Sequence, residues 1–137
     1  MKTRIVVADF GVDTSPKFYR NLYNTVKDLD ISIVMANAGL LLVNYWMGTS
    51  MRQSTLMMDV NMYHYMMMHK IFIPKLLDRT KAGKRCAFIA VASVSWLRQF
   101  PSPMHTYSGT KVFTGYLSRA FIKELHDMRA VEQEDGS

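Results

Sequence analysis

The chain has 137 residues, enough for one modest domain over residues 1–137, and 49% of them are hydrophobic, which argues against intrinsic disorder. The net charge of +6 favours anionic partners such as phosphate groups, but the basic residues are scattered, so no nucleic-acid partner is expected. No apolar run approaches the roughly 18 residues that a membrane span requires. Because Cys86 is the single cysteine, no internal disulfide is possible, which fits a reducing compartment.

The first third of the sequence predicts two buried strands with a helix between them. Residues 5–8 and 31–36 are short apolar runs rich in β-branched side chains, the pattern of buried parallel strands. Ser15 followed by Pro16 marks the start of the helix, and apolar residues at helical spacing continue it to about Asp28.

A long helix and a third strand follow. The helix begins at Ser50 or Ser54 and runs to Leu77, and Pro74 is expected to bend it or to end it. It is rich in methionine, which we interpret as adaptable packing rather than as metal ligation. Residues 86–92 form the third apolar run, which predicts another buried strand.

The last predicted helix covers residues 106–129, and residues 130–137 form an acidic tail that we expect to fray. The element order is therefore β-α-β-α-β-α. Strands that alternate with long helices predict an α/β fold in which helices cover a parallel sheet.

Tyr107 and Lys111 open the last helix four residues apart, so their side chains lie on one helix face. A positive charge beside a phenol favours the phenolate, which makes the pair suited to proton transfer. A tyrosine that gives a proton to a carbonyl oxygen, or takes one from an alcohol, suits carbonyl reduction and alcohol oxidation. The spacing alone is weak evidence, because Tyr-x-x-x-Lys arises often by chance.

Other polar residues fall where the predicted strands end, and ligands of parallel α/β sheets bind beyond the carboxyl ends of the strands. One polar residue follows each strand, and one more lies on the long helix. We therefore expect a single site made of Asp9, Asn37, Ser93 or Ser95, Asn61, Tyr107 and Lys111.

In this order the pieces resemble the short-chain dehydrogenase/reductase family over nearly the whole chain, which implies a partial Rossmann-like sheet. The matching segments are Val7-Ala8-Asp9-Phe10, Asn37-Ala38-Gly39, Asp59-Val60-Asn61, the serine after the third strand, and Tyr107-x-x-x-Lys111. The first segment, Leu76 near the end of the long helix, and Pro101-x-Pro103 resemble best the branch of 3-oxoacyl-CoA reductases and 17β-hydroxysteroid dehydrogenase-like proteins.

The resemblance implies a role for each matched residue. Tyr107 would be the general acid/base, and Lys111 would assist it and hydrogen-bond the nicotinamide ribose. Ser93 would hold the substrate carbonyl, and Asn61 would anchor a water molecule in a proton relay. The cofactor cleft would be lined by Asp9, Asn37, Ala38, Gly39, Tyr107 and Lys111. Hydride would come from the cofactor, and the protein would position it and supply the proton.

The serine has two candidate positions. Ser93 follows the strand directly, as the family pattern asks, whereas Ser95 fits better when the count starts from Pro101. We prefer Ser93. The sequence also departs from the family, which usually has asparagine where Ala90 stands before this serine.

Structural alternatives remain open for the other residues. Asp9 and Asn37 also suit plain strand-end caps, and Asn61 also suits a buried helix amide bonded to the backbone. The histidines have no ligand-like spacing with cysteine or carboxylates, so we interpret them as packing or surface residues: His64, His69 and His105.

The sequence has no Gly-x-x-x-Gly-x-Gly turn, which in this family opens the fold and holds the pyrophosphate on backbone N–H groups. In the strand order 3-2-1-4-5-6, the three predicted strands correspond to strands 3, 4 and 5, so the first lacks its neighbours. Either it slides to pair with the second strand, or the chain is a fragment of a longer protein. We favour the fragment, without the first βαβ unit and the C-terminal strands.

Two functions are carried forward. The first is an oxidoreductase that reduces a ketone or oxidises an alcohol on a lipid-like substrate, with NADP(H) favoured over NAD(H) by the resemblance. The second is a catalytically inactive binding or dimerisation protein, which would pair with a second copy or a relative through the helices at 54–77 and 106–129. The resemblance suggests the cytosolic face of the endoplasmic reticulum or the cytoplasm.

Overall fold

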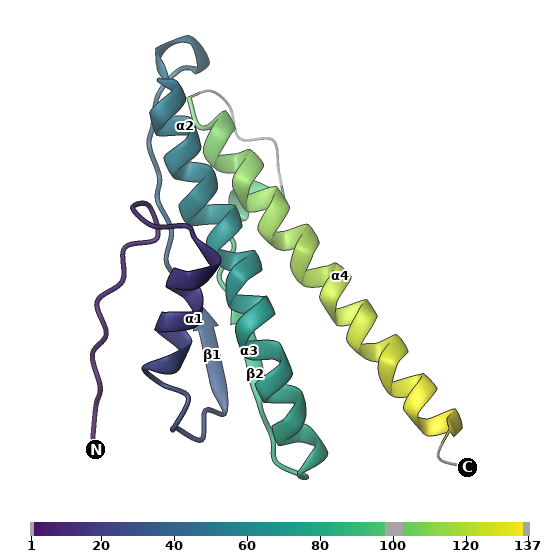
Figure 1. The fold of residues 1–137 in the computed structure, drawn as a ribbon. Coiled ribbons are helices and arrows are strands. Elements are labelled where there is room, and N and C mark those ends of the chain that lie inside the picture. The colour runs from purple at the N-terminus through teal and green to yellow at the C-terminus, as the bar shows by residue number, and fades with distance from the viewer. Residues whose placement is uncertain (1, 98–102, 136–137) are drawn as a thin grey trace.

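A computed structural model describes residues 2–97 and 103–135 and has the expected α/β architecture. Two short parallel strands lie beside a long helical rod, and a second long helix leans against the rod (Figure 1). The elements are α1 (Pro16–Asn24), β1 (Ile33–Ala36), η1 (Trp46–Gly48), α2 (Met51–Met58), the π-helix η2 (Asp59–Tyr63), α3 (His64–Lys81), β2 (Ala87–Ala90), η3 (Val94–Trp96) and α4 (His105–Asp135).

The sheet pairs the second and third predicted strands. β1 and β2 run parallel, with Ile33 opposite Ala87 and Ala36 opposite Ala90. One face packs on α3, where Val34 meets Phe72 and Leu76 in a hydrophobic core. Ile33, on the other face, is 60% exposed. The parallel pairing and the helix over it confirm the predicted fold class.

The strand predicted at residues 5–8 does not form, so that prediction was wrong. Within the described residues the sheet has two strands, and the first run neither joins them nor slides against β1. Val7 is 95% exposed. A strand needs a hydrogen-bonded neighbour, and apolar composition alone does not supply one. The segment lies extended along the molecule, where Arg4 donates to both carboxylate oxygens of Asp28 at 2.7 and 2.9 Å.

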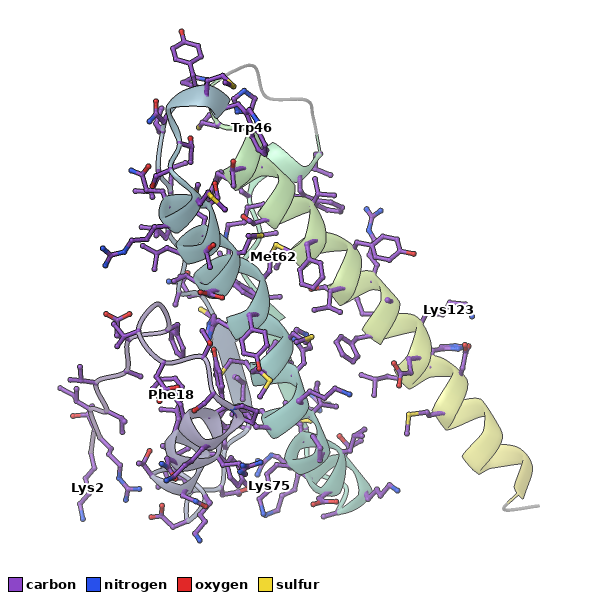
Figure 2. The ribbon with its side chains drawn as sticks, turned by 45° about the horizontal axis from the view of Figure 1, so that its top comes forward. Lys2, Phe18, Trp46, Met62, Lys75 and Lys123 are labelled. Carbon is purple, nitrogen blue, oxygen red and sulfur yellow. The ribbon has the colours of Figure 1, made fainter. Side chains whose placement is uncertain are left out.

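Aromatic packing fixes the end of this extended segment to the helices. The ring of Phe10 lies 3.8 Å from that of His64 on α3, and 6.0 and 6.1 Å from those of Phe18 and Tyr19 on α1, between ring centroids. Figure 2 shows Phe18 among the side chains of this corner. Such ring contacts add to the burial of apolar surface, so Phe10 is held in place although residues 2–7 are exposed.

α1 begins as predicted and ends early. Ser15 is its N-cap, and its hydroxyl accepts the N–H of Phe18 at 3.2 Å, with Pro16 in the first turn. The predicted end near Asp28 was too late, because the helix ends at Asn24. The chain then makes tighter turns in which the N–H of Val26 bonds to Tyr23. The helical spacing of apolar residues continues beyond Asn24, but the backbone hydrogen bonds of an α-helix do not.

The long predicted helix is one continuous rod made of α2, η2 and α3. Its N-cap is Ser50, which forms a reciprocal capping box with Gln53. Pro74 does not end the rod, because α3 continues to Lys81. Pro74 is exposed, so water can satisfy the carbonyl that lost its partner. No helix in the described part of the chain is both long and apolar enough to cross a membrane.

α4 packs on α2 and η2 near its start and leans away from α3 further along (Figure 1). Its close fit near η3 depends on Gly115, because a Cβ there would lie 2.7 Å from the Trp96 ring, over which Arg119 stacks at 4.5 Å. The helix continues to Asp135, past the predicted end, so the tail expected to fray is helical to that point. Residues 136–137 and most of the proline-bearing loop predicted before α4 lie outside the described residues.

Substitution by alanine is expected to change the unfolding free energy in opposite directions at two glycines of α4. Gly115→Ala is expected to cost about 1–3 kcal/mol of unfolding free energy, because the new methyl group must displace the Trp96 ring. Gly109 has open space around its Cβ position, so Gly109→Ala is expected to gain about 0.5–1 kcal/mol from helix propensity. Urea unfolding followed by circular dichroism measures both. Equal effects of the two substitutions would contradict the packing described at Gly115.

Candidate active site

The carboxyl ends of β1 and β2 open into a cleft of about 700 Å³. The segment after each strand, the start of α4 and the extended N-terminal segment form its walls. The cleft is lined by Val7, Ala8, Asp9, Phe10, Asn37, Ala38, Gly39, Leu40, Leu41, Val60, Val91, Ala92, Tyr107 and Lys111. All six residues predicted to bind a cofactor are among them, although they come from three separate parts of the chain.

Tyr107 and Lys111 occupy the first turns of α4, and the structure keeps them together at the cleft. The Nζ atom of Lys111 lies 5.7 Å from the centroid of the Tyr107 ring. The four-residue spacing alone places this pair on one helix face. The packing of α4 on η2 is what turns that face toward the ends of the strands.

Lys111 is a buried cation with spare hydrogen-bonding capacity. Only 3% of the residue is exposed, and burial lowers the pKa of its ammonium group. The hydrogen bond from Nζ goes to the backbone oxygen of Val91 and is long, at 3.4 Å. An ammonium group has three donors, so Nζ can also donate to hydroxyl groups of a ligand in the cleft.

Tyr65 is part of the site although the sequence did not single it out. Its ring is fully buried with its centroid 5.4 Å from Nζ of Lys111, and its hydroxyl donates to the backbone oxygen of Val91 at 2.6 Å. Burial raises the pKa of Tyr65 to about 12, and the neighbouring Tyr107 adds to the shift. Tyr65 therefore stays protonated and fixes the segment after β2. The sequence offered one signal for Tyr65: it lies four residues after Asn61, which places the two on the same face of a helix.

Asn61 ties two walls of the cleft together. Its Oδ1 accepts the N–H of Leu40 at 2.8 Å, and its Nδ2 donates to the carbonyl of Leu40 at 2.8 Å. The second N–H of Nδ2 goes to Oγ1 of Thr110 on α4 at 3.0 Å. Both donors of the amide are thus used within the protein. The water-anchoring role predicted for Asn61 would have to use its remaining acceptors.

Two threonines that the sequence analysis did not select complete this connection. Oγ1 of Thr110 donates to the backbone oxygen of Tyr107 at 2.7 Å. Oγ1 of Thr114 lies 2.9 Å from the backbone oxygen of Asn61 and is buried. They lie three and seven residues after Tyr107, on the same side of α4, and this periodicity is the signal that was available.

The π-helix η2 is the local feature that aims Asn61. π-helical turns are rare, and they occur frequently at functional sites because the extra residue changes the direction of the side chains. Asn61 is the buried residue of η2, between α2 and α3. A regular helical pattern through residues 59–63 does not predict the wider turn.

Gly39 lets the segment after β1 approach the buried lysine. A Cβ at this position would lie 3.2 Å from Nζ of Lys111 and 3.3 Å from Oδ1 of Asn61. The backbone at Gly39 therefore lies close to two protein side chains of the site. Asn37, on the same segment, is exposed at the cleft.

Asp9 and the two serines have local hydrogen-bonding roles. Oδ1 of Asp9 accepts the N–H of Gly11 at 2.9 Å, so the carboxylate shapes a turn while also lining the cleft. Oγ of Ser93 accepts the N–H of Ser95 at 3.3 Å, and neither serine is among the residues that line the cleft. Ser95 is buried, and its hydroxyl has no hydrogen-bond partner among the described residues. The choice between the two as the carbonyl-binding serine stays a prediction.

Three of the four histidines, His64, His69 and His105, lie in aromatic packing. His69 lies between Phe88 and Phe121, with ring centroids 4.1 and 4.6 Å away. His64 is buried under Phe10, and burial lowers its pKa to about 4, with the positive charge of Lys111 adding to the shift. In the part of the chain that the structure describes, no three His, Cys, Asp or Glu side chains are grouped in a way that suits a metal ion.

The residues present fit one end of a nicotinamide dinucleotide. The buried ammonium of Lys111 offers unused donors for ribose hydroxyls, and Gly39 leaves room beside it. A second cleft of about 670 Å³ adjoins the first and shares Asp9, Gly39, Leu40 and Val60 with it, so a long ligand can extend from one to the other. The pyrophosphate has no Gly-rich turn in this sequence to hold it.

Comparisons with known proteins agree with this architecture. No family model and no curated protein matches the chain. Among solved structures, 4-hydroxyisoleucine dehydrogenase complexed with NADH superposes with a TM-score of 0.74 at 18% identity, over 89% of this chain and 52% of that one. A short-chain dehydrogenase from Streptomyces avermitilis gives 0.76 at 16%, over 89% and 43%. ElxO with NADP bound gives 0.69 at 21%, over 83% and 45%.

These likenesses show the fold, which is the Rossmann-like fold of short-chain dehydrogenases. The chain spans about half of the length of these solved structures. The part it spans holds the strand ends, the π-helix and the Tyr107–Lys111 face that form the cleft.

Removing the Asn61 amide is expected to loosen the cleft. Asn61→Leu leaves the N–H and carbonyl of Leu40 without their partners, so the unfolding free energy should fall by about 2–4 kcal/mol. Thr110→Val removes one acceptor and should cost about 1 kcal/mol. Urea unfolding measures both, and the milder variant keeps the test open if Asn61→Leu does not fold. A wild-type stability for both variants would show that these bonds do not hold the cleft together.

The unfolding free energy is expected to decrease as the pH is lowered, because of His64. Its pKa is about 4 in the folded chain against an ordinary 6.5, so between these values the unfolded chain binds a proton that the folded chain does not. The loss begins as the pH falls through about 6.5 and should reach about 2 kcal/mol by about pH 5. Burial lowers the pKa of His69 as well, which adds a loss of the same sign.

Urea titrations at a series of pH values test this expectation. His64→Phe should flatten the dependence of the unfolding free energy on pH, whereas the control His126→Gln, at an exposed position, should leave it unchanged. An unaltered pH dependence in His64→Phe would contradict the assignment.

Proposed function

We propose that this chain carries the proton-transfer and ribose-binding half of an NAD(P)(H)-dependent oxidoreductase of the short-chain dehydrogenase type. The observation that carries the proposal is Lys111, a buried ammonium beside Tyr107 whose hydrogen bond to Val91 is long, at a cleft where parallel strands end. A buried charge costs free energy unless it is paired, and a ligand in the cleft would pair it. The neighbours of the same fold, solved with NADH or NADP, support the choice of cofactor.

The chain's own residues would divide the work as follows. The phenol of Tyr107 gives its proton to the carbonyl oxygen of the substrate, or takes one from the alcohol in the reverse direction. Lys111 stabilises the phenolate that remains and donates to the ribose hydroxyls. A bound nicotinamide supplies or accepts the hydride. Ser93 orients the carbonyl, and Asn61 keeps α4 in register with the segment after β1 through Thr110 and Leu40.

We also propose a lipid-like keto or hydroxy substrate, such as a 3-oxoacyl-CoA or a steroid, and NADP(H) before NAD(H). The sequence resemblance to the 3-oxoacyl-CoA reductase and 17β-hydroxysteroid dehydrogenase-like branch supports both. The lining of the cleft supports an apolar substrate, because apolar side chains make up most of its walls: Val7, Ala8, Phe10, Leu40, Leu41, Val60, Val91 and Ala92.

The second candidate function is a non-catalytic binding protein that pairs with a second copy or with a relative of the same fold. The outer face of α4 favours it, since Tyr116 and Ile122 are 75% and 69% exposed on an otherwise regular helix. Size-exclusion chromatography with light scattering distinguishes it, because a chain that stays monomeric alone and with a relative lacks this function.

Titration of the chain into NADPH or NADH tests the first function. The fluorescence of the reduced nicotinamide is expected to change, and Lys111→Met should weaken binding about tenfold or more, because a ribose partner is lost. Tyr107→Phe keeps the ring and should retain binding while it abolishes reduction of a 3-oxoacyl thioester, measured as cofactor oxidation. The comparison of the two cofactors measures the proposed preference for NADP(H).

The control for these variants is Tyr116→Phe, which removes a hydroxyl from α4 outside the cleft and should change neither readout. A chain that leaves the fluorescence of millimolar NADPH and NADH unaltered lacks the proposed function. Turnover that survives in Tyr107→Phe would remove the tyrosine from its role.

A further inference from the structure

The end of the molecule where α2 and α4 begin projects four large apolar side chains into water. Met47 is 93% exposed, Met51 89%, Tyr45 67% and Trp46 63%. We call residues 45–51 the apolar tip. It is the turn above α2 in Figure 1, and Figure 2 labels Trp46 there. Exposed apolar patches of this kind mark interaction sites.

The backbone of the tip is held by a dense set of hydrogen bonds. Asn44 donates from Nδ2 to the carbonyl of Gly48 at 2.7 Å and accepts the N–H of Tyr45 on Oδ1 at 2.9 Å. Thr49 donates to the carbonyl of Tyr45 at 3.0 Å, and the N–H of Asn44 bonds to Pro103 at 3.0 Å, beside α4. The turn is therefore fixed, and most of the surface of its apolar side chains is exposed to water.

The segment that forms the tip carries no negative charge. Residues 31–58 contain no acidic residue, and their single charge is Arg52 in the first turn of α2. α2 and α4 both start at this end, so the positive ends of two helix dipoles face the same way as the tip. The chain as a whole carries +6. This end of the molecule therefore complements an anionic surface.

We propose that the apolar tip docks on a lipid surface, with Trp46, Met47 and Met51 in the interface and Arg52 at anionic headgroups. Tryptophan and tyrosine favour the boundary between headgroups and acyl chains, where an apolar ring and a polar group are both satisfied. The tip lies at one end of the molecule (Figure 1), where a bilayer can meet it without a matching pocket. The other exposed apolar surfaces, on the sheet and on α4, belong to regular faces of the kind that pack against further elements.

The docked tip would bring the cleft to the bilayer. The ring of Trp46 packs edge-on against that of His105, 6.3 Å between centroids, and His105 lies two residues before Tyr107. Leu41, on the segment that leads to the tip, lines the cleft. A lipid-like substrate would then enter from the membrane beside Tyr107. This consequence rests on the proposed function, whereas the docking itself does not.

Co-sedimentation of the full chain with phosphatidylcholine vesicles, with and without phosphatidylserine, tests the docking in the absence of any cofactor. The chain is expected to sediment with the vesicles that contain phosphatidylserine. The double variant Trp46→Ser/Met47→Ser should lower the partition coefficient about tenfold or more, since two apolar side chains no longer leave water. Arg52→Gln should lower it about fivefold on anionic vesicles and little on neutral ones.

The matched control is Tyr116→Ser/Ile122→Ser, which removes a similar apolar area from the exposed face of α4 and should bind vesicles as the wild type does. Failure of the wild type to sediment with either kind of vesicle overturns the proposal. Loss of binding in the control, or unchanged binding in Trp46→Ser/Met47→Ser, places the contact elsewhere and overturns it too. A dimer that is present without lipid and abolished by the tip variant would show that the tip meets a second copy instead.

Discussion

The carboxamide of Asn61 is the interaction on which the cleft depends. It satisfies both backbone groups of Leu40 and the hydroxyl of Thr110, so one buried side chain joins the segment after β1 to α4. A buried amide left without partners would cost more than its bonds contribute, which makes this connection specific as well as stabilising. The wide turn of η2 is what brings the amide to that place. Tyr107 and Lys111 face the cleft because α4 is held there.

The position of Lys111 follows from the same connection and carries an energetic cost. Its ammonium is buried beside the rings of Tyr65 and Tyr107, and the hydrogen bond it donates to Val91 is long. Desolvation disfavours the charged form, and the surrounding rings and carbonyl offset this in part. A site that keeps a cation buried and incompletely paired is arranged for an oxygen-rich ligand.

The local elements were predictable to the extent that local rules decide them. Ser15 and Ser50 cap their helices as their types suggest, and the runs at 31–36 and 86–92 contain the two strands. The run at 5–8 satisfied the same composition rule and failed, because a strand forms only against a neighbour. α1 ended before its apolar spacing did. The six residues predicted to line the cofactor cleft came from a family pattern, and all six line the cleft. Tyr65, Thr110 and Thr114 were not selected, because their spacing from Asn61 and Tyr107 gains meaning only through the tertiary contacts that join them to the site.

The sequence by itself determined the alternation of helices and strands from α1 onward, the helix caps, and the placing of Tyr107 and Lys111 on one helix face, because these depend on side-chain type and spacing within a few residues. Tertiary structure decided which apolar runs pair, that the Asn61 amide spends its donors on Leu40 and Thr110, and that the lysine is buried. It also decided that the aromatic and methionine side chains at 45–51 face water instead of a core. Tertiary hydrogen bonds and burial depend on residues that are far apart in the chain, and the spacing of residues along the sequence does not show which of them will meet.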